Sequence, residues 1–169
     1  MIRLSPKRLF ALFLIFAFPS LTLAGPPTAK QAIASFGKIQ GADQSARVVG
    51  MVGFYGQDQP PQWAILKPDW KVANLMHEYV MRDGKIVGER RFWRDAKQDL
   101  PTVAIPFDKI AIDSSRAFVL ADQEAKKAGL GFDMIHYQLR GRDLRNEPVW
   151  VLNLVDGGQQ SIGVLYISA

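Results

Sequence analysis

Residues that could carry acid–base or metal chemistry are few, because the chain has two histidines and no cysteine. Catalysis at neutral pH usually employs a histidine, a thiolate, a metal or a tuned carboxylate pair. His77 and Glu78 are adjacent, so on a strand they point to opposite faces and cannot share a ligand. His136 follows Asp133 by three residues, so on a strand these two side chains also point to opposite faces. We favour surface or pocket-edge histidines over a metal site joining them, and expect no metal and no cofactor.

Two further groups have simpler interpretations than catalysis. Ser114 and Ser115 precede a helical segment, where capping of the helix accounts for them. Glu78 and Glu89 are expected to face each other in a hairpin, and opposed carboxylates can raise the pKa of one member. Nearby arginines favour a surface lattice of ion pairs instead. We therefore expect a protein that is not an enzyme.

Basic and aromatic residues alternate in one short segment, which indicates binding. Tryptophan, tyrosine and arginine dominate the energetics of protein interfaces. The alternative is that Phe92 belongs to the core and the arginines protect a sheet edge. A separate aromatic residue, Trp70, follows Pro68-Asp69 on an expected loop and should be exposed. The candidate binding residues are Tyr79, Arg90, Arg91, Trp93, Arg94 and Trp70.

A β-hairpin must position most of these residues. Strands over 74–82 and 85–94 flank Asp83-Gly84, a two-residue loop suited to a type I′ turn. A regular register from that turn places Tyr79 opposite Gly88 and Glu78 opposite Glu89.

Other segments predict helices and strands on both sides of the hairpin. Thr28 is expected to cap a helix over 29–36, which Gly37 ends. A second helix is expected to begin with Asp113, Ser114 or Ser115 as its cap and to run to Ala128, where Gly129 ends it. Patterns rich in β-branched and aromatic residues predict strands over 47–55, 62–67, 132–140, 149–155 and 162–168. Trp63 and Trp150 are expected to anchor the core, because an indole buries a large area.

The first 24 residues have the three-part pattern of a secretory signal peptide. Basic residues precede the apolar run 9–18, and Thr22-Leu23-Ala24 supplies small residues before a cut at Gly25. The run is too short to span a membrane, which takes about 20 apolar residues. We therefore expect cleavage, a periplasmic or secreted location, and no stable membrane insertion afterwards.

Composition excludes several classes of protein. The 169 residues are 48% hydrophobic and 22% charged, which is typical of a globular chain and not of a disordered or collagen-like one. Three of the 21 Lys and Arg lie within residues 1–24, and none of the 16 acidic residues does, so the remainder carries +2. That charge is too small for a nucleic-acid footprint. The missing cysteine excludes disulfides, thiolate metal sites and a lipid-anchoring cysteine.

An internal repeat organises the chain. Gly56-Gln57-Asp58 precedes Trp63, and Gly141-Arg142-Asp143 precedes Trp150, and the second tryptophan follows the first by 87 positions. In each half a helix and a strand come before, and a turn and a strand after. We expect a first unit over 25–100, a connector over 101–112 and a second unit over 113–169. These units either stack or share one longer sheet; chance likeness of Gly-Asp turns and Trp strands is the alternative.

The segment 113–169 resembles a PepSY-type domain of the cystatin-like group of folds. The resemblance depends on an Ala/Lys-rich helix ending Ala-Lys-Lys-Ala-Gly, on Glu147-Pro148-Val149-Trp150-Val151-Leu152 and on the closing strand that follows a Gly-containing turn. It implies an exported, non-catalytic module, and protease inhibition or binding is proposed for some such domains. Tandem helix-plus-sheet repeats also look like secreted β-lactamase inhibitor proteins. Neither likeness transfers a functional residue.

Together these observations predict an α+β protein of two cystatin/PepSY-like helix-plus-antiparallel-sheet units. Its expected function is to bind another exported protein, as an inhibitor or otherwise, through a concave sheet and the hairpin 79–94. One alternative is a small-ligand-binding protein or pocket enzyme of cone-shaped α+β fold, which requires a pocket with His77 or His136 near a carboxylate. A further alternative is a structural, envelope-associated protein whose uncharged strand 162–168 pairs with another chain.

Overall fold

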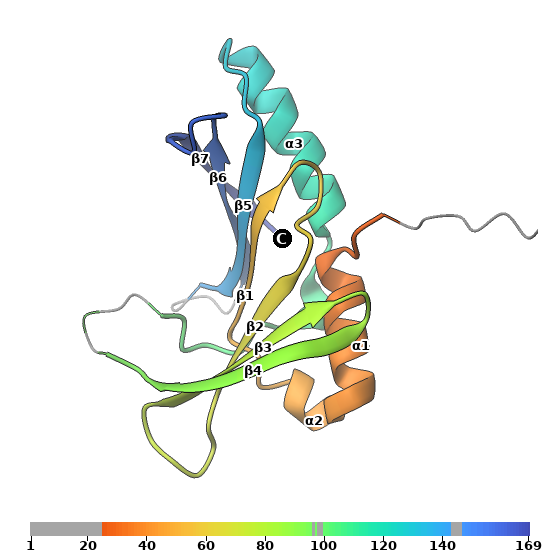
Figure 1. Cartoon of the computed structure of the whole chain (residues 1–169), viewed down its shortest axis with the longest axis vertical. Coiled ribbons are helices and arrows are strands. Elements are labelled where there is room, and N and C mark those ends of the chain that lie inside the picture. Colours follow the sequence, from red (N-terminus) through yellow and green to blue (C-terminus); the bar gives the residue numbers. More distant parts are fainter. Residues whose placement is uncertain (1–24, 96, 98–99, 143–146) are drawn as a thin grey trace, which may run out of the picture.

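The computed structural model describes residues 25–95, 97, 100–142 and 147–169, and the predicted leader and Asp143 lie outside these ranges. Strands from both halves form one seven-stranded antiparallel sheet of order β4-β3-β2-β1-β5-β6-β7, and two longer helices pack beside it (Figure 1). The predicted α+β class is confirmed. Among the described helices, none has the length and apolar character needed to cross a membrane.

The elements follow the predicted order closely. The helices are α1 (Ala29–Gln40), α2 (Ala42–Ser45) and α3 (Ser114–Lys127), with a 3₁₀ turn η1 (Phe107–Lys109). The strands are β1 (Gly50–Gly56), β2 (Trp63–Pro68), β3 (Leu75–Arg82), β4 (Lys85–Trp93), β5 (Met134–Gly141), β6 (Pro148–Val155) and β7 (Ser161–Ser168).

Helix α1 is longer than its sequence predicts. Gly37 was expected to stop it, but the helix continues to Gln40 and ends where Gly41 adopts φ 101°. Glycine inside a helix costs only about 1 kcal/mol, which the buried stripe of α1 can offset. Thr28 caps the helix as predicted, with Gln31 completing a capping box. Gly129, at φ 68°, follows α3 as expected.

The N-termini of α1 and α3 meet, and Asp113 and Ser114 at the start of α3 also cap α1. Asp113 Oδ1 accepts hydrogen bonds from the backbone N–H of Ser114 at 2.7 Å and of Lys30 at 3.1 Å. The Ser114 hydroxyl accepts from the N–H of Ala29 at 3.0 Å and donates to Gln59 Oε1 at 2.6 Å. Residues about 85 positions apart therefore satisfy the first N–H groups of α1, which a helix cannot satisfy internally.

The β3–β4 hairpin departs from the predicted register. Met81 pairs with Ile86 but Val80 pairs with Gly88, so Val87 is an extra residue on β4. Beyond that bulge every pairing moves by one: Tyr79 faces Glu89, and Glu78 faces Arg90. The predicted pairs of Tyr79 with Gly88 and Glu78 with Glu89 are wrong. The turn fixes only the first pairs, and one inserted residue resets the remainder.

The two predicted core tryptophans are fully buried and occupy equivalent places. The indole N–H of Trp63 donates to the carbonyl of Pro27 at 2.8 Å, and that of Trp150 donates to the carbonyl of Ile112 at 2.8 Å. Each acceptor is the residue immediately before a helix N-cap. The indole rings lie 6.2 Å apart and both contact Tyr137, so they form the centre of the core.

The sheet is strongly twisted, and the segment around Leu100 and Pro101 partly covers one end of it. In Figure 1, β3 and β4 run crosswise to β5, β6 and β7. From Leu100 the chain crosses toward α3 (Figure 1), and Leu100 itself packs on a small second core of Val49, Leu66 and Met76. A Cβ at Gly50 would lie 2.9 Å from the Pro101 ring, so glycine permits this crossing.

Candidate binding surface

The sheet has one covered face and one open face. Side chains alternate along strands, and those that join the helix-packed core, such as Met51, Trp63 and Leu152, define the covered face. The intervening residues define the open face, and the register aligns them in rows. His136 neighbours Asn153 and then Val164, while Gln138 neighbours Val151 and then Tyr166.

An uncharged aromatic surface lies on this open face. We call it the aromatic patch and define it as Phe54, Tyr55, His136, Val164 and Tyr166. The exposed fractions are 51% for Phe54 and Tyr55, 49% for Val164 and 70% for Tyr166. The half-buried residues between them, Gln138, Val151 and Asn153, carry no charge. A face of this kind contacts water at an energetic disadvantage unless a partner covers it.

A bulge in β1 brings both aromatic side chains of the strand to this patch. The pairing of β1 with β5 shifts between Gly53 and Gly56, and Tyr55 takes the left-handed φ of 56°. The following loop folds back on the strand, so a Cβ at Gly53 would lie 2.3 Å from the Pro60 ring. The glycines thus permit a close approach that bends the strand.

His136 lies between the two aromatic rings of β1. Its ring centroid is 5.2 Å from that of Phe54 and 4.7 Å from that of Tyr55, both edge-on. Its Nε2 is buried and has no hydrogen-bond partner among the described residues. Burial lowers the pKa of the imidazole, so the ring is neutral at pH 7 and the patch stays uncharged.

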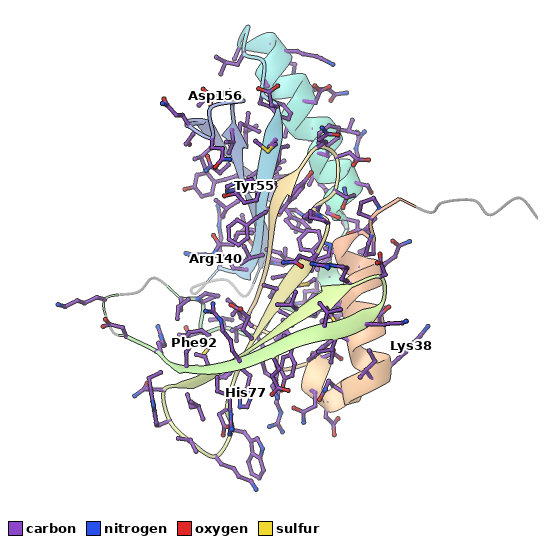
Figure 2. The ribbon with its side chains drawn as sticks, viewed as in Figure 1. Lys38, Tyr55, His77, Phe92, Arg140 and Asp156 are labelled. Carbon is purple, nitrogen blue, oxygen red and sulfur yellow. The ribbon has the colours of Figure 1, made fainter. Side chains whose placement is uncertain are left out.

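A polar cluster forms at the other end of the sheet, around His77. His77 Nε2 lies 2.8 Å from Asp69 Oδ2, and His77 Nδ1 lies 3.5 Å from Glu89 Oε1. The other Asp69 oxygen accepts from the N–H groups of Lys71 and Val72. Figure 2 shows Tyr55 and His77 well separated. Because His136 contacts Tyr55, the two histidines do not meet. Among the described residues, no group of three or more His, Asp or Glu side chains is arranged so that it could hold a metal ion.

Shifted pKa values in the cluster reflect burial and mutual pairing. The His77 hydrogen bond, followed by the two backbone N–H groups, lowers the pKa of Asp69 to about 2. Burial lowers the pKa of Lys67, whose ammonium donates to Gln44 Oε1 at 2.5 Å. Burial and then Glu89 raise the pKa of Tyr79. The contact of Asp69 with His77 thus connects the β2–β3 loop to β3, and this structural role accounts for the ionised state of the carboxylate.

Two cavities among the described residues lie away from the aromatic patch. One of about 680 Å³ opens between α1, α2 and η1, and its lining includes Ile33, Ile105 and Phe107 but neither histidine. A second, of about 370 Å³, is lined by His77, Glu89, Arg90 and Arg91. A histidine near carboxylates, which the pocket alternative requires, therefore occurs only beside the smaller of these two cavities.

The predicted binding residues lie at several different places. Tyr79 is only 5% exposed and packs against Phe36, so a partner cannot reach it without rearrangement. Arg90 is held on Glu78 by two bonds of 2.8 Å and lies 5.4 Å from the Phe92 ring centroid.

The remaining predicted residues lie near the ends of β2 and β4. Arg91 pairs across the sheet with His77 on the covered-face side. Arg94 donates to the Leu100 carbonyl at 3.3 Å. Trp70 and Trp93 are 68% and 67% exposed, as expected for binding aromatics, and Lys71 lies 4.6 Å from the Trp70 ring centroid.

Sequence reasoning did not find the aromatic patch. Phe54 and Tyr55 are adjacent, so a regular strand would separate them onto opposite faces. Isolated glycines at positions 53 and 56 were the available signal, because glycine within a strand marks a bulge or a close backbone approach. The chain matches no protein-family model, no curated protein and no solved structure.

Proposed function

We propose that this chain is an exported, non-catalytic module that binds another exported protein, and that the aromatic patch is its docking surface. The observation that carries the proposal is an uncharged, half-exposed aromatic surface on the sheet face that the helices leave open. Interfaces are enriched in tyrosine, phenylalanine and tryptophan and depleted of charge at their centre. The export component of the proposal is based on the signal-peptide pattern of residues 1–24.

Rigid support favours the same function. The patch spans β1, β5, β6 and β7, and the opposite face of these strands packs on the central Trp63, Tyr137 and Trp150 cluster. A surface held by a packed core loses little entropy on binding. The matching indole bonds of Trp63 and Trp150 also support two related helix-plus-sheet units, with β1 and β5 meeting at the centre.

A capture experiment with matched variants tests the proposal. The bait is the chain from Gly25, which contains every described element, offered to exported proteins of the source organism. The patch variant combines Phe54→Thr, suited to a strand, with Tyr55→Asn, because asparagine tolerates positive φ. The control variant, Arg91→Ser with Trp93→Ser, removes exposed residues of the hairpin instead.

We expect a stoichiometric partner that the wild type and the control variant retain and the patch variant loses. Circular dichroism must show that both variants fold. If only the hairpin variant loses the partner, the docking surface lies on β4 and not on the aromatic patch. A partner retained by both variants, or no saturable partner at all, would reject the patch as a docking surface.

A small-ligand function is the second candidate, favoured by the 680 Å³ cavity beside α1 and α2. Its apolar lining suits a hydrophobic ligand. Thermal stabilisation of the wild type by a panel of apolar compounds, abolished by Ile33→Asp, would support this function. The same panel should leave the patch variant as stabilised as the wild type.

A further inference from the structure

The two edges of the sheet are chemically unlike. β4 carries Lys85, Glu89, Arg90 and Arg91, whereas β7 carries no charged residue and no proline. Charges and prolines are how proteins prevent an exposed edge from pairing with another chain. The β6–β7 ladder is regular from Gly163 to Ser168, so no bulge distorts that part of the edge. β4 is therefore protected, and β7 is not.

Comparison of the two halves shows which neighbour β7 lacks. The order β3-β2-β1-β5-β6-β7 is symmetrical about the β1–β5 contact, so β7 occupies the place of β3. The outer edge of β3 is paired along its length with β4. No strand among the described residues pairs with the outer edge of β7. The fold itself thus shows a strand accommodated at the equivalent position.

Backbone and side chains at this edge are both available. The Ala169 N–H donates to the Pro148 carbonyl, which fixes the alternation of the ladder. In an antiparallel strand each residue directs its N–H and C=O to the same side, and that side alternates from one residue to the next. Because the backbone of Ala169 faces β6, the backbone groups of Val164 and Tyr166 point away from β6. Their side chains, on the open face, are also the most exposed apolar ones of the strand.

We propose that β7 pairs antiparallel with β7 of a second copy of this chain, about a two-fold axis perpendicular to the sheet. An uncharged strand meets an uncharged strand, whereas two β4 edges would bring Arg90 and Arg91 of both copies close together. In such a pair a residue whose backbone groups point outward lies opposite a residue of the other copy whose backbone groups also point outward. Val164 and Tyr166 of both copies therefore meet on the open face, as aromatic and β-branched cross-strand neighbours that each stabilise a sheet.

The consequence is a continuous sheet through both copies, with the two aromatic patches on the same side. This dimer does not depend on the proposed docking function, because it uses the outer edge of β7, where Val164 and Tyr166 border the patch, and not the rings of Phe54 and Tyr55. A bivalent docking surface would follow if both proposals hold. The oligomeric state and the capture experiment therefore fail or succeed separately.

Light scattering coupled to gel filtration, on the chain from Gly25 across a wide range of concentration, tests the pairing. We expect a dimer that dissociates on dilution. Val164→Pro removes an outward N–H without breaking the β6–β7 ladder and should give a monomer, while Val164→Thr, which keeps that N–H, should remain dimeric. Val87→Lys, an exposed site on β4, is the matched edge control and should not alter the dimer.

A second variant protects the test against misfolding. Tyr166→Lys changes a largely exposed side chain, so the fold should persist, but it places a charge beside the partner strand and should also give a monomer. A wild type that is monomeric at every concentration overturns the proposal. So does a dimer that persists in both Val164→Pro and Tyr166→Lys. Dimerisation unchanged by Phe54→Thr with Tyr55→Asn supports an interface that does not use the two β1 rings of the patch.

Discussion

Replacing Asp113 by alanine should destabilise both long helices at once. One carboxylate oxygen accepts N–H groups from Ser114 of α3 and Lys30 of α1. Loss of an N-cap side chain costs about 1 kcal/mol, and loss of the second hydrogen bond about 1 kcal/mol more. The negative charge also faces the positive ends of two helix dipoles, which adds about 0.5 kcal/mol at this half-exposed position. We expect Asp113→Ala to lower the free energy of unfolding by about 2.5 kcal/mol.

Urea denaturation at low salt, followed by tryptophan fluorescence, measures this change. Asp113→Asn retains a capping oxygen but loses the charge, so it should cost less than the alanine variant, and added salt should narrow its difference from wild type. Asp122→Ala is the matched control within α3: it removes an exposed pair with Lys126 and should cost about 0.3–0.5 kcal/mol. A loss below about 0.5 kcal/mol for Asp113→Ala, or equal losses for alanine and asparagine, would refute the shared cap.

Three further predictions concern the sheet. Gly53→Ala should lower the melting temperature, because its Cβ would overlap the Pro60 ring; an unchanged temperature would mean that the loop can move freely. His136 has a lowered pKa in the fold, so the unfolded chain binds its proton more readily and stability should fall as pH decreases from about 6.5. Urea titrations at several pH values should show a flatter decline for His136→Gln, and identical declines would contradict this account. A double-mutant cycle should give Glu78 and Arg90 a favourable coupling below about 1 kcal/mol, whereas zero coupling would dismiss the ion pair.

Sequence patterns were sufficient for the elements but not for the surfaces they form. Periodicity and capping residues located the helices and strands, because these signals are local. Two bulges that shape the binding surfaces were missed, one near Phe54 and one at Val87, since each inserts a single residue without changing strand composition. The Glu78–Arg90 pair and the joining of two aromatic rings around His136 both depend on those insertions. Functional geometry here thus depends on register, which tertiary packing decides.

Joining β1 to β5 at the centre of the sheet has a consequence for how the chain acquires its structure. Met51 pairs with Leu139, so the middle of the sheet closes only after most of the chain is present. Contacts so distant in sequence slow folding, because the loop entropy must be lost before the pairing stabilises anything. Until then the inner edge of β1 and the first turn of α1 both lack their partners. The first half of the polypeptide is therefore an incomplete fragment. Until the second half is present, it must either stay unfolded or be kept from pairing its open strand edge with another chain.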